Sequence, residues 1–174
     1  KPVLMIHGSV ENGKIFYSKK GKGLAPYLAS KGYDVYVPDL RGRGESTPAI
    51  AKGVNHTQHD LITIDLPACI NKIEAIKGQQ LIHAIGHSWG GVLLLSYFAR
   101  YNDLRLKSFV FFGTKRRITV QSFEKFWKIN LAWRLLGNLM AATKGYLPAK
   151  QLKMGSDNEP KDHFRHTDTW VRKK

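Results

Sequence analysis

Residues 81–95 read LIHAIGHSWGGVLLL: a short apolar run, a group of small residues around Ser88, and a second apolar run. The pentapeptide from Gly86 to Gly90 fits the pattern G-x-S-x-G, with a predicted strand before it and a predicted helix after it. Small residues on both sides of the serine let strand and helix approach closely enough for a sharp turn. Such a turn holds the hydroxyl at the carboxyl end of a sheet, near a helix N-terminus that stabilises negative charge. Ser88 is therefore predicted to be a nucleophile rather than an ordinary turn serine.

The stretch His7-Gly8-Ser9 follows the first apolar run and supplies a second feature that this chemistry needs. A serine that attacks a carbonyl carbon needs two hydrogen-bond donors about 3 Å from the developing oxyanion. One candidate is the backbone N–H of Trp89, the residue after the nucleophile. Because Gly8 permits a tight turn after the strand, the N–H of Ser9 is the second candidate; the alternative is a plain glycine turn. We expect His7, at the strand end, to line the pocket.

Elsewhere, short apolar runs alternate with helical patterns, which is typical of a parallel sheet covered by helices. Strands are expected at 2–7, 33–37, 80–85 and 106–112, and helices at about 23–30, 59–77 and 90–101. After residue 114 the pattern changes. Residues 121–142 have the wide apolar face of an amphipathic helix or helix pair, and no clear strand is expected beyond them. The predicted division is an α/β core at 1–114 and a helical cap or lid at 115–174.

Composition and charge limit the class of protein. A chain of 174 residues with 43% hydrophobic residues is long and apolar enough for one globular domain. The single cysteine, Cys69, excludes an intrachain disulfide and favours a reducing compartment, so a cytoplasmic location is expected. The formal net charge is +15, and residues 114–174 hold 14 Lys/Arg against 5 Asp/Glu. A solvated basic surface is the simpler interpretation of this charge, and weak contact of the basic cap with an anionic membrane surface is the alternative. Without a zinc-ligand spacing, a basic zipper or an RNA-binding strand pair, nucleic acid is not expected as a partner.

Three motifs in order resemble the α/β-hydrolase fold superfamily, in particular the lipase, esterase and monoacylglycerol-lipase-like serine hydrolases. They are MIHGS at 5–9, VPDLRGRGES at 37–46 and AIGHSWGG at 84–91, and the resemblance covers about residues 2–114. It implies a three-layer α/β/α sandwich with a mostly parallel sheet, and an enzyme that needs no cofactor or metal. It also implies that the loop from Asp39 to Ser46 orders the strand end near the active-site entrance. In that loop Asp39 can accept backbone N–H bonds.

The sequence departs from the family in two respects. The family has further strands before the His-Gly strand, and its triad runs Ser, then Asp or Glu, then His along the chain. Here Gly113 and Thr114, directly after the strand expected at 106–112, supply no carboxylate, and His87 on its tight turn is expected to point away from Ser88. His163 and His166 come late enough, but they lie in a polar tail with no predicted strand and are interpreted as exposed residues. The catalytic acid and base are therefore expected outside this sequence, which resembles an incomplete chain.

The leading hypothesis is a serine hydrolase that cleaves a small-molecule carboxylic ester through an acyl-enzyme on Ser88. His7, Gly8, Gly86, His87 and Gly90 would support the turn and the pocket, and the apolar cap favours an apolar acyl group. An acyltransferase, a thioesterase or a cofactor-free haloperoxidase would have the same motifs. The second hypothesis is a non-catalytic binding protein that keeps the pocket without the triad. The sequence favours no particular oligomeric state.

Overall fold

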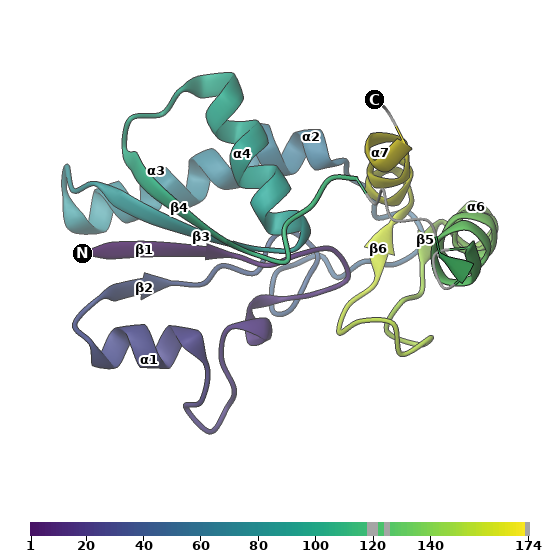
Figure 1. Cartoon of the computed structure of the whole chain (residues 1–174), viewed down its shortest axis with the longest axis horizontal. Helices are drawn as coiled ribbons and strands as arrows, with labels where there is room; N and C mark the ends of the chain where they lie inside the picture. Colours follow the sequence, from purple (N-terminus) through teal and green to yellow (C-terminus); the bar gives the residue numbers. More distant parts are fainter. Residues whose placement is uncertain (118–121, 124–125, 173–174) are drawn as a thin grey trace.

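The first part of the chain forms a central parallel sheet with the strand order β2-β1-β3-β4 (Figure 1). The computed structural model describes residues 1–117, 122–123 and 126–172. The strands are β1 (Pro2–Ile6), β2 (Asp34–Tyr36), β3 (Ile82–His87) and β4 (Leu106–Phe112). Leu4 at the centre of β1 lies opposite Tyr36 on one side and Ala84 on the other, and every pairing in this sheet is parallel. The four predicted strands and the parallel sheet are thus confirmed.

Helices cover both faces of this sheet, which gives the predicted three layers (Figure 1). One face is covered by α1, and the other by α3 and α4. The short 3-10 helix η1 precedes α1, while α2 and the π-helical turn η2 lead directly into α3. The bounds are η1 (Gly13–Ile15), α1 (Leu24–Ser30), α2 (Gln58–Asp60), η2 (Leu61–Asp65), α3 (Leu66–Lys77) and α4 (Trp89–Tyr101).

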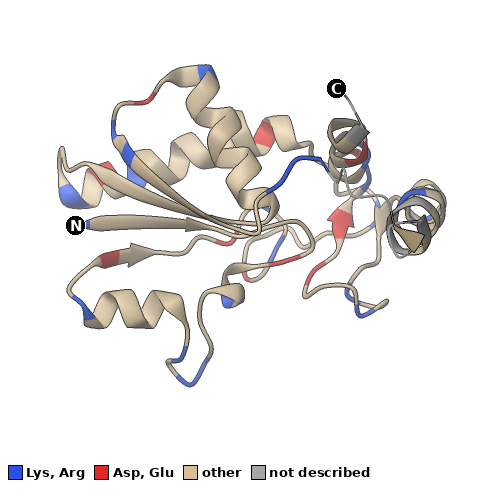
Figure 2. Cartoon of the chain, in the orientation of Figure 1, with Lys and Arg blue, Asp and Glu red and all other residues tan. Residues whose placement is uncertain are grey.

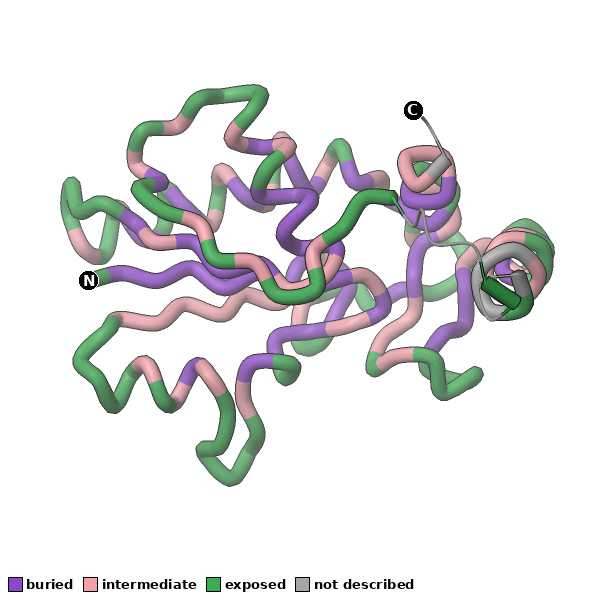
Figure 3. Tube along the Cα trace, in the orientation of Figure 1, coloured by how far each residue is buried: buried purple, intermediate pink, exposed green. Residues whose placement is uncertain are grey.

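The alternation of side chains along β1 explains why two apolar cores form. Leu4 and Ile6 belong to the core under α3 and α4. Val3 and Met5 point to the opposite face and belong to the core under α1. All five residues of β1 are buried, so this strand lies at the centre of the molecule (Figure 3). A strand buried on both faces reads as a continuous apolar run, which is how PVLMI appears in the sequence.

The second part of the chain lies beyond the carboxyl ends of the parallel strands (Figure 1). It consists of η3 (Phe126–Leu136), α6 (Gly137–Lys144), β5 (Tyr146–Leu147), β6 (Glu159–Pro160) and α7 (Lys161–Arg172). β5 and β6 pair as antiparallel strands. A third apolar core joins this part to the first, because it contains Val10 together with Ala141, Leu147, Ala149 and Phe164.

Two expectations for the second part are corrected. The sequence predicted no strand after residue 142, yet β5 and β6 form a short pair. The tail that was interpreted as exposed is helix α7, in which His163, Phe164, Thr167 and Asp168 are buried. These four residues have helical spacing, but only one of them is apolar. The predicted helix at 121–142 is present from residue 126, and positions 121 and 124–125 lie outside the described residues.

The basic residues are spread over the surface of both parts, with one concentrated run after β4 (Figure 2). That run, Lys115 to Arg117, passes close to α7 (Figure 2). Within the described ranges, every helix is too short or too polar to cross a bilayer.

Candidate active site

Ser88 lies on the turn between β3 and α4, with φ 50° and ψ −122°. A positive φ is uncommon for a residue with a Cβ and marks locally strained backbone, which is often found at functional sites. The Ser88 N–H donates to the carbonyl oxygen of Phe112 at 2.8 Å, so the turn is tied to the end of β4. The serine is therefore held in one conformation by the sheet on one side and by the helix on the other.

Glycines flank this turn because there is no room for a side chain. A Cβ on Gly86 would lie 2.5 Å from the Cα of Gly91, which is too close for any real contact. A Cβ on Gly90 would lie 2.2 Å from the carbonyl oxygen of Ile6. The close approach of strand and helix that the sequence predicted is therefore present, and it also brings α4 against the end of β1.

A cavity of about 320 Å³ opens at Ser88. Ser9 and Trp89, the two predicted oxyanion donors, line this cavity together with the serine. The Ser9 Oγ is buried, and within the described residues it has no hydrogen-bond partner. Both parts of the chain contribute to the walls, since Trp133, Thr167 and Val171 come from the second part, and Lys115 and Arg116 follow β4.

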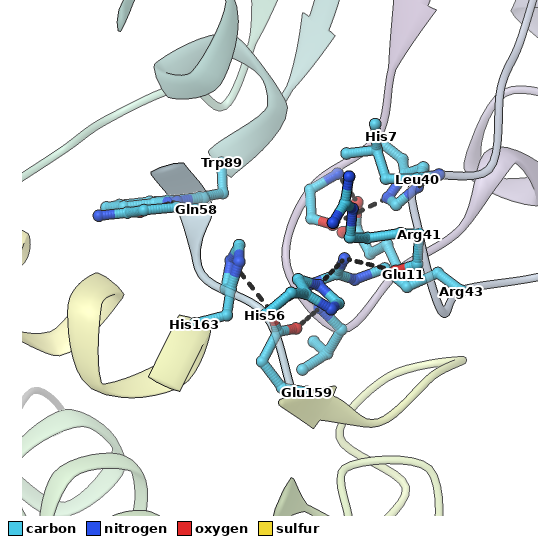
Figure 4. Close-up of polar contacts among 12 residues, drawn as sticks. His7, Glu11, Leu40, Arg41, Arg43, His56, Gln58, Trp89, Glu159 and His163 are labelled. Atoms are coloured by element: carbon cyan, nitrogen blue, oxygen red, sulfur yellow. Dashed lines mark hydrogen bonds and ion pairs between the residues drawn. The ribbon is translucent and has the colours of Figure 1, made fainter. Parts of the chain in front are cut away.

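The Trp89 side chain is anchored away from solvent. Its Nε1–H donates to the Gln58 Oε1 at 3.0 Å (Figure 4). Its ring centroid lies 6.3 Å from that of Trp170. These contacts fix the first turn of α4 immediately after Ser88. The Gln58 contact could not be predicted from local sequence patterns, because the two residues are 31 positions apart.

His7 does not line the cavity, contrary to the sequence prediction. The ring is fully buried, Nδ1 lies 2.9 Å from the carbonyl oxygen of Gly8, and Nε2 accepts the N–H of Leu40 at 3.1 Å (Figure 4). Burial, together with the positive charge of Arg43, lowers the pKa of His7 to about 4. His7 is thus a neutral cross-link between the end of β1 and the loop that follows β2.

Glu11 is a residue of the cavity that sequence reasoning missed. Its Oε2 accepts the Gly8 N–H at 2.9 Å and lies 2.8 Å from Nδ1 of His87. A Cβ on Gly8 would lie 2.9 Å from both the Glu11 Oε2 and the Ser88 Cβ, so the loop after β1 packs directly against the serine turn. Only the presence of an acidic residue three positions after the glycine could have suggested this contact.

Asp39 accepts backbone N–H bonds, as predicted. Its Oδ1 accepts from Gly13 at 2.7 Å and its Oδ2 from Glu45 at 2.9 Å. Position 44 favours glycine for two reasons: its φ is 57°, and a Cβ there would lie 2.0 Å from the Asp39 Oδ2. Asp39 therefore orders the loop after β2 and links it to η1.

A buried polar cluster lies beside the cavity and is centred on Glu159. Arg43 and Glu159 are each 1% exposed, and the Arg43 Nη2 donates to the Glu159 Oε1 (Figure 4). The Glu159 Oε2 accepts the Val10 N–H at 2.7 Å, and the Nε2 of His163 lies 3.0 Å from Oε1. Burial, and then Arg43, lower the pKa of His56 to about 3 and that of His163 well below its usual range. Both histidines are therefore neutral, and Arg43 is the cation that compensates the buried carboxylate.

The residues available to serve as base for Ser88 are limited. Among the described residues, no histidine lines the Ser88 cavity. His87 contacts Glu11, and His163 is buried against Glu159. His166 lines a separate groove with His59 and Arg100. The late histidines that the sequence offered are thus not next to the serine.

A family model described as the alpha/beta hydrolase fold matches residues 1–153. The chain belongs to the α/β-hydrolase fold family. Gastric triacylglycerol lipase of Rattus norvegicus is 28% identical over 157 residues, which cover 85% of this chain and 40% of the lipase. Epoxide hydrolase 3 of Siraitia grosvenorii is 32% identical over 108 residues, which cover 62% of this chain and 30% of that enzyme.

An esterase from Exiguobacterium antarcticum superposes on all of this α/β-hydrolase chain and on 66% of its own chain, with a TM-score of 0.60 and 17% identity. At that identity the match shows a shared fold. The chain spans 40% or less of the length of the two sequence relatives above. Their names support a hydrolase, in agreement with the motifs.

Proposed function

We propose that this α/β hydrolase is a serine hydrolase that cleaves a carboxylic ester through an acyl-enzyme on Ser88. One observation carries the proposal: Ser88 has a strained, positive φ on a strand–helix turn and faces a cavity that Ser9 and Trp89 also line. This combination supports a role in which the hydroxyl attacks a bound carbonyl group and the backbone N–H groups of Ser9 and Trp89 bind the oxyanion. The lipase and esterase names among the similar proteins support the same chemistry.

In the proposed reaction the Ser88 Oγ attacks the acyl carbon and its proton passes to a base. The carbonyl oxygen becomes an oxyanion that accepts the N–H groups of Ser9 and Trp89, and one such donor contributes about 10²–10³-fold to kcat. The alcohol then leaves with a proton, and water attacks the acyl-enzyme and releases the acid. Among the described residues of the cavity wall there is no histidine to serve as this base.

A serine favours an acyl substrate over an epoxide. Attack of the Ser88 Oγ on an epoxide carbon would form an ether, which has no carbonyl for water to attack. Attack on an ester forms a new ester, which water can hydrolyse. The similarity to an epoxide hydrolase therefore does not extend to an epoxide substrate in this proposal.

The cavity walls favour an apolar acyl group. Val10, Trp133 and Val171 line the cavity, and burial of each CH₂ of an acyl chain against such residues contributes about 0.8 kcal/mol. Two of these three residues belong to the second part of the chain, which supports a role for residues 115–174 as a cap over the acyl group.

One observation favours the alternative of a non-catalytic binding protein. Within the described residues the cavity has no histidine in its wall, and a serine without a base is a weak nucleophile. Such a protein would bind an apolar acyl compound in the same cavity without turnover.

Labelling of Ser88 by a fluorophosphonate probe separates these functions. We expect the whole protein to be labelled at Ser88 and to release p-nitrophenolate from p-nitrophenyl esters, with rates that rise with acyl-chain length. Ser88→Ala should abolish both signals, while Ser96→Ala, a serine variant within α4, should retain them. Binding of the ester without labelling or hydrolysis would contradict the enzyme proposal and favour the binding protein.

A further inference from the structure

Val10 has a backbone conformation that its side chain disfavours. Its φ is 55°, a region in which a β-branched residue is a genuine outlier. It directly follows Ser9, whose N–H is the proposed oxyanion donor. Such a conformation persists only where the surrounding structure enforces it, and the contacts that do so are visible.

The contacts come from the segment of residues 155–159, which ends in β6. The Val10 N–H donates to the Glu159 Oε2 at 2.7 Å, and the Asp157 N–H donates to the Val10 carbonyl oxygen at 3.1 Å. The neighbouring Asn12 Nδ2 donates to the Asp157 Oδ2 at 2.6 Å. Both backbone polar groups of Val10 are thus bound by a segment about 150 residues further along the chain.

Packing reinforces these hydrogen bonds. The Val10 side chain lies in the third apolar core with Leu147 and Phe164. Gly155 lies so close that a Cβ there would be 2.2 Å from the Val10 carbonyl oxygen and 2.7 Å from its Cβ. Glu159 is itself held by Arg43 in the buried cluster (Figure 4), so the segment that contacts Val10 has a fixed position.

Ser9 therefore lies between two anchored peptide groups. The Gly8 N–H is bound by the Glu11 carboxylate, and the Val10 N–H is bound by the Glu159 carboxylate. We propose that residues 155–159 are a positioning element for the oxyanion site: they hold Val10 in its left-handed conformation and so direct the Ser9 N–H toward the reacting carbonyl oxygen. This inference rests on the proposed function of Ser88.

The variant Gly155→Ala tests the proposal because residue 155 is not part of the cavity wall, while its new methyl group displaces Val10. We expect kcat for a p-nitrophenyl ester, per site titrated with fluorophosphonate, to fall about 10²-fold, as on loss of an oxyanion donor. KM should stay within about two-fold, because the substrate gains its contact with the Ser9 N–H mainly in the transition state. Gln151→Ala, at an exposed position before this segment, is the control and should leave kcat unchanged.

A second variant covers the case in which Gly155→Ala does not fold. Asn12→Asp keeps a side-chain acceptor for the Lys14 N–H but places a carboxylate against Asp157. It should also lower kcat. Both variants should weaken the binding of a boronic acid that forms a tetrahedral adduct on Ser88.

The outcomes are distinguishable. An unchanged kcat per titrated site in the folded variants, beside a wild type that reacts at Ser88, overturns the positioning role and leaves the proposed function intact. A rise in KM with unchanged kcat also overturns it, because that result indicates a contact made with the ground state. A wild type that does not react at Ser88 overturns both proposals.

Discussion

The Glu11 carboxylate lies 2.8 Å from Nδ1 of His87, and this contact joins the loop after β1 to the residue that precedes Ser88. The same Oε2 accepts the Gly8 N–H at 2.9 Å. One carboxylate oxygen therefore fixes the two backbone segments between which the proposed oxyanion would form. Both side chains are only partly exposed, at 23% for Glu11 and 29% for His87.

Removal of the Glu11 carboxylate is predicted to lower catalysis more than stability. Glu11→Ala leaves the Gly8 N–H and His87 without this acceptor, and we expect kcat to fall by about 10- to 100-fold, below the loss of a whole oxyanion donor. Glu11→Gln keeps a neutral acceptor and should retain most of kcat. Glu45→Ala, an exposed variant in the loop after β2, is the control. Steady-state ester hydrolysis is the measurement, and equal activity of Glu11→Ala and wild type would contradict the prediction.

Removal of one partner of the buried Arg43–Glu159 pair is predicted to be strongly destabilising. Arg43→Met leaves the Glu159 carboxylate buried without its cation, and such a change lowers the free energy of unfolding by about 3–5 kcal/mol. Urea denaturation followed by tryptophan fluorescence measures the loss. Arg165→Met, at an exposed position of α7, should change stability by less than about 0.5 kcal/mol. A similar small effect for Arg43→Met would show that the pair is not buried as described.

Stability is predicted to fall in mild acid because buried histidines must remain neutral. The pKa values of His7 and His56 are lowered from 6.5 to about 4 and about 3, so the unfolded chain binds protons that the folded chain does not. The stability that these neutral rings contribute to the free energy of unfolding is therefore complete above about pH 6.5. It is lost progressively as the pH falls toward 4. Arg43 and the neighbouring His163 oppose protonation of His56, while Glu159 favours it.

The urea midpoint measured from about pH 7 to about pH 5 tests this expectation. It should decrease in the wild type and decrease less steeply in His56→Gln. His59→Gln, which changes an exposed histidine, should follow the wild type. A midpoint independent of pH in the wild type would contradict neutral burial of these rings.

Helix α7 is predicted to be an integral part of the fold. Phe164 is fully buried and its ring centroid lies 5.1 Å from that of Trp133. Phe164→Ala should lower the free energy of unfolding by about 3–5 kcal/mol through lost burial and a residual cavity. Arg165→Ala, the exposed neighbour, should be close to neutral. If thermal unfolding of the two variants coincides, α7 does not pack on the third core.

Local patterns made the first part of the chain predictable. The buried run PVLMI, the glycines around Ser88 and the acceptor role of Asp39 depend on neighbours close in sequence or on chain geometry alone. The positions of His7 and Glu159 depend on partners that are distant in sequence. His7 was expected to line the cavity, but its Nε2 is taken by the N–H of Leu40, 33 residues away. Glu159 lies in a polar stretch, and nothing within that stretch indicates that it is buried against Arg43.

The burial of α7 was missed for a related reason. His163, Thr167 and Asp168 are polar, and they are buried because other parts of the chain pack against them. A search for apolar residues at helical spacing does not identify such polar positions as buried. The residues that complete the cavity from the second part, Thr167 and Val171, were therefore not found from the sequence.

The bonding of Val10 to Asp157 and Glu159 has a consequence for exchanging parts of this protein with those of related hydrolases. A chimera that replaces residues 115–172 as a unit would remove the acceptor of the Val10 N–H, the donor to its carbonyl oxygen and most of the apolar core around its side chain. The conformation of the loop after β1 therefore depends on the 155–159 segment, although the two are far apart in sequence. Recombination would preserve this loop only if both segments were transferred together.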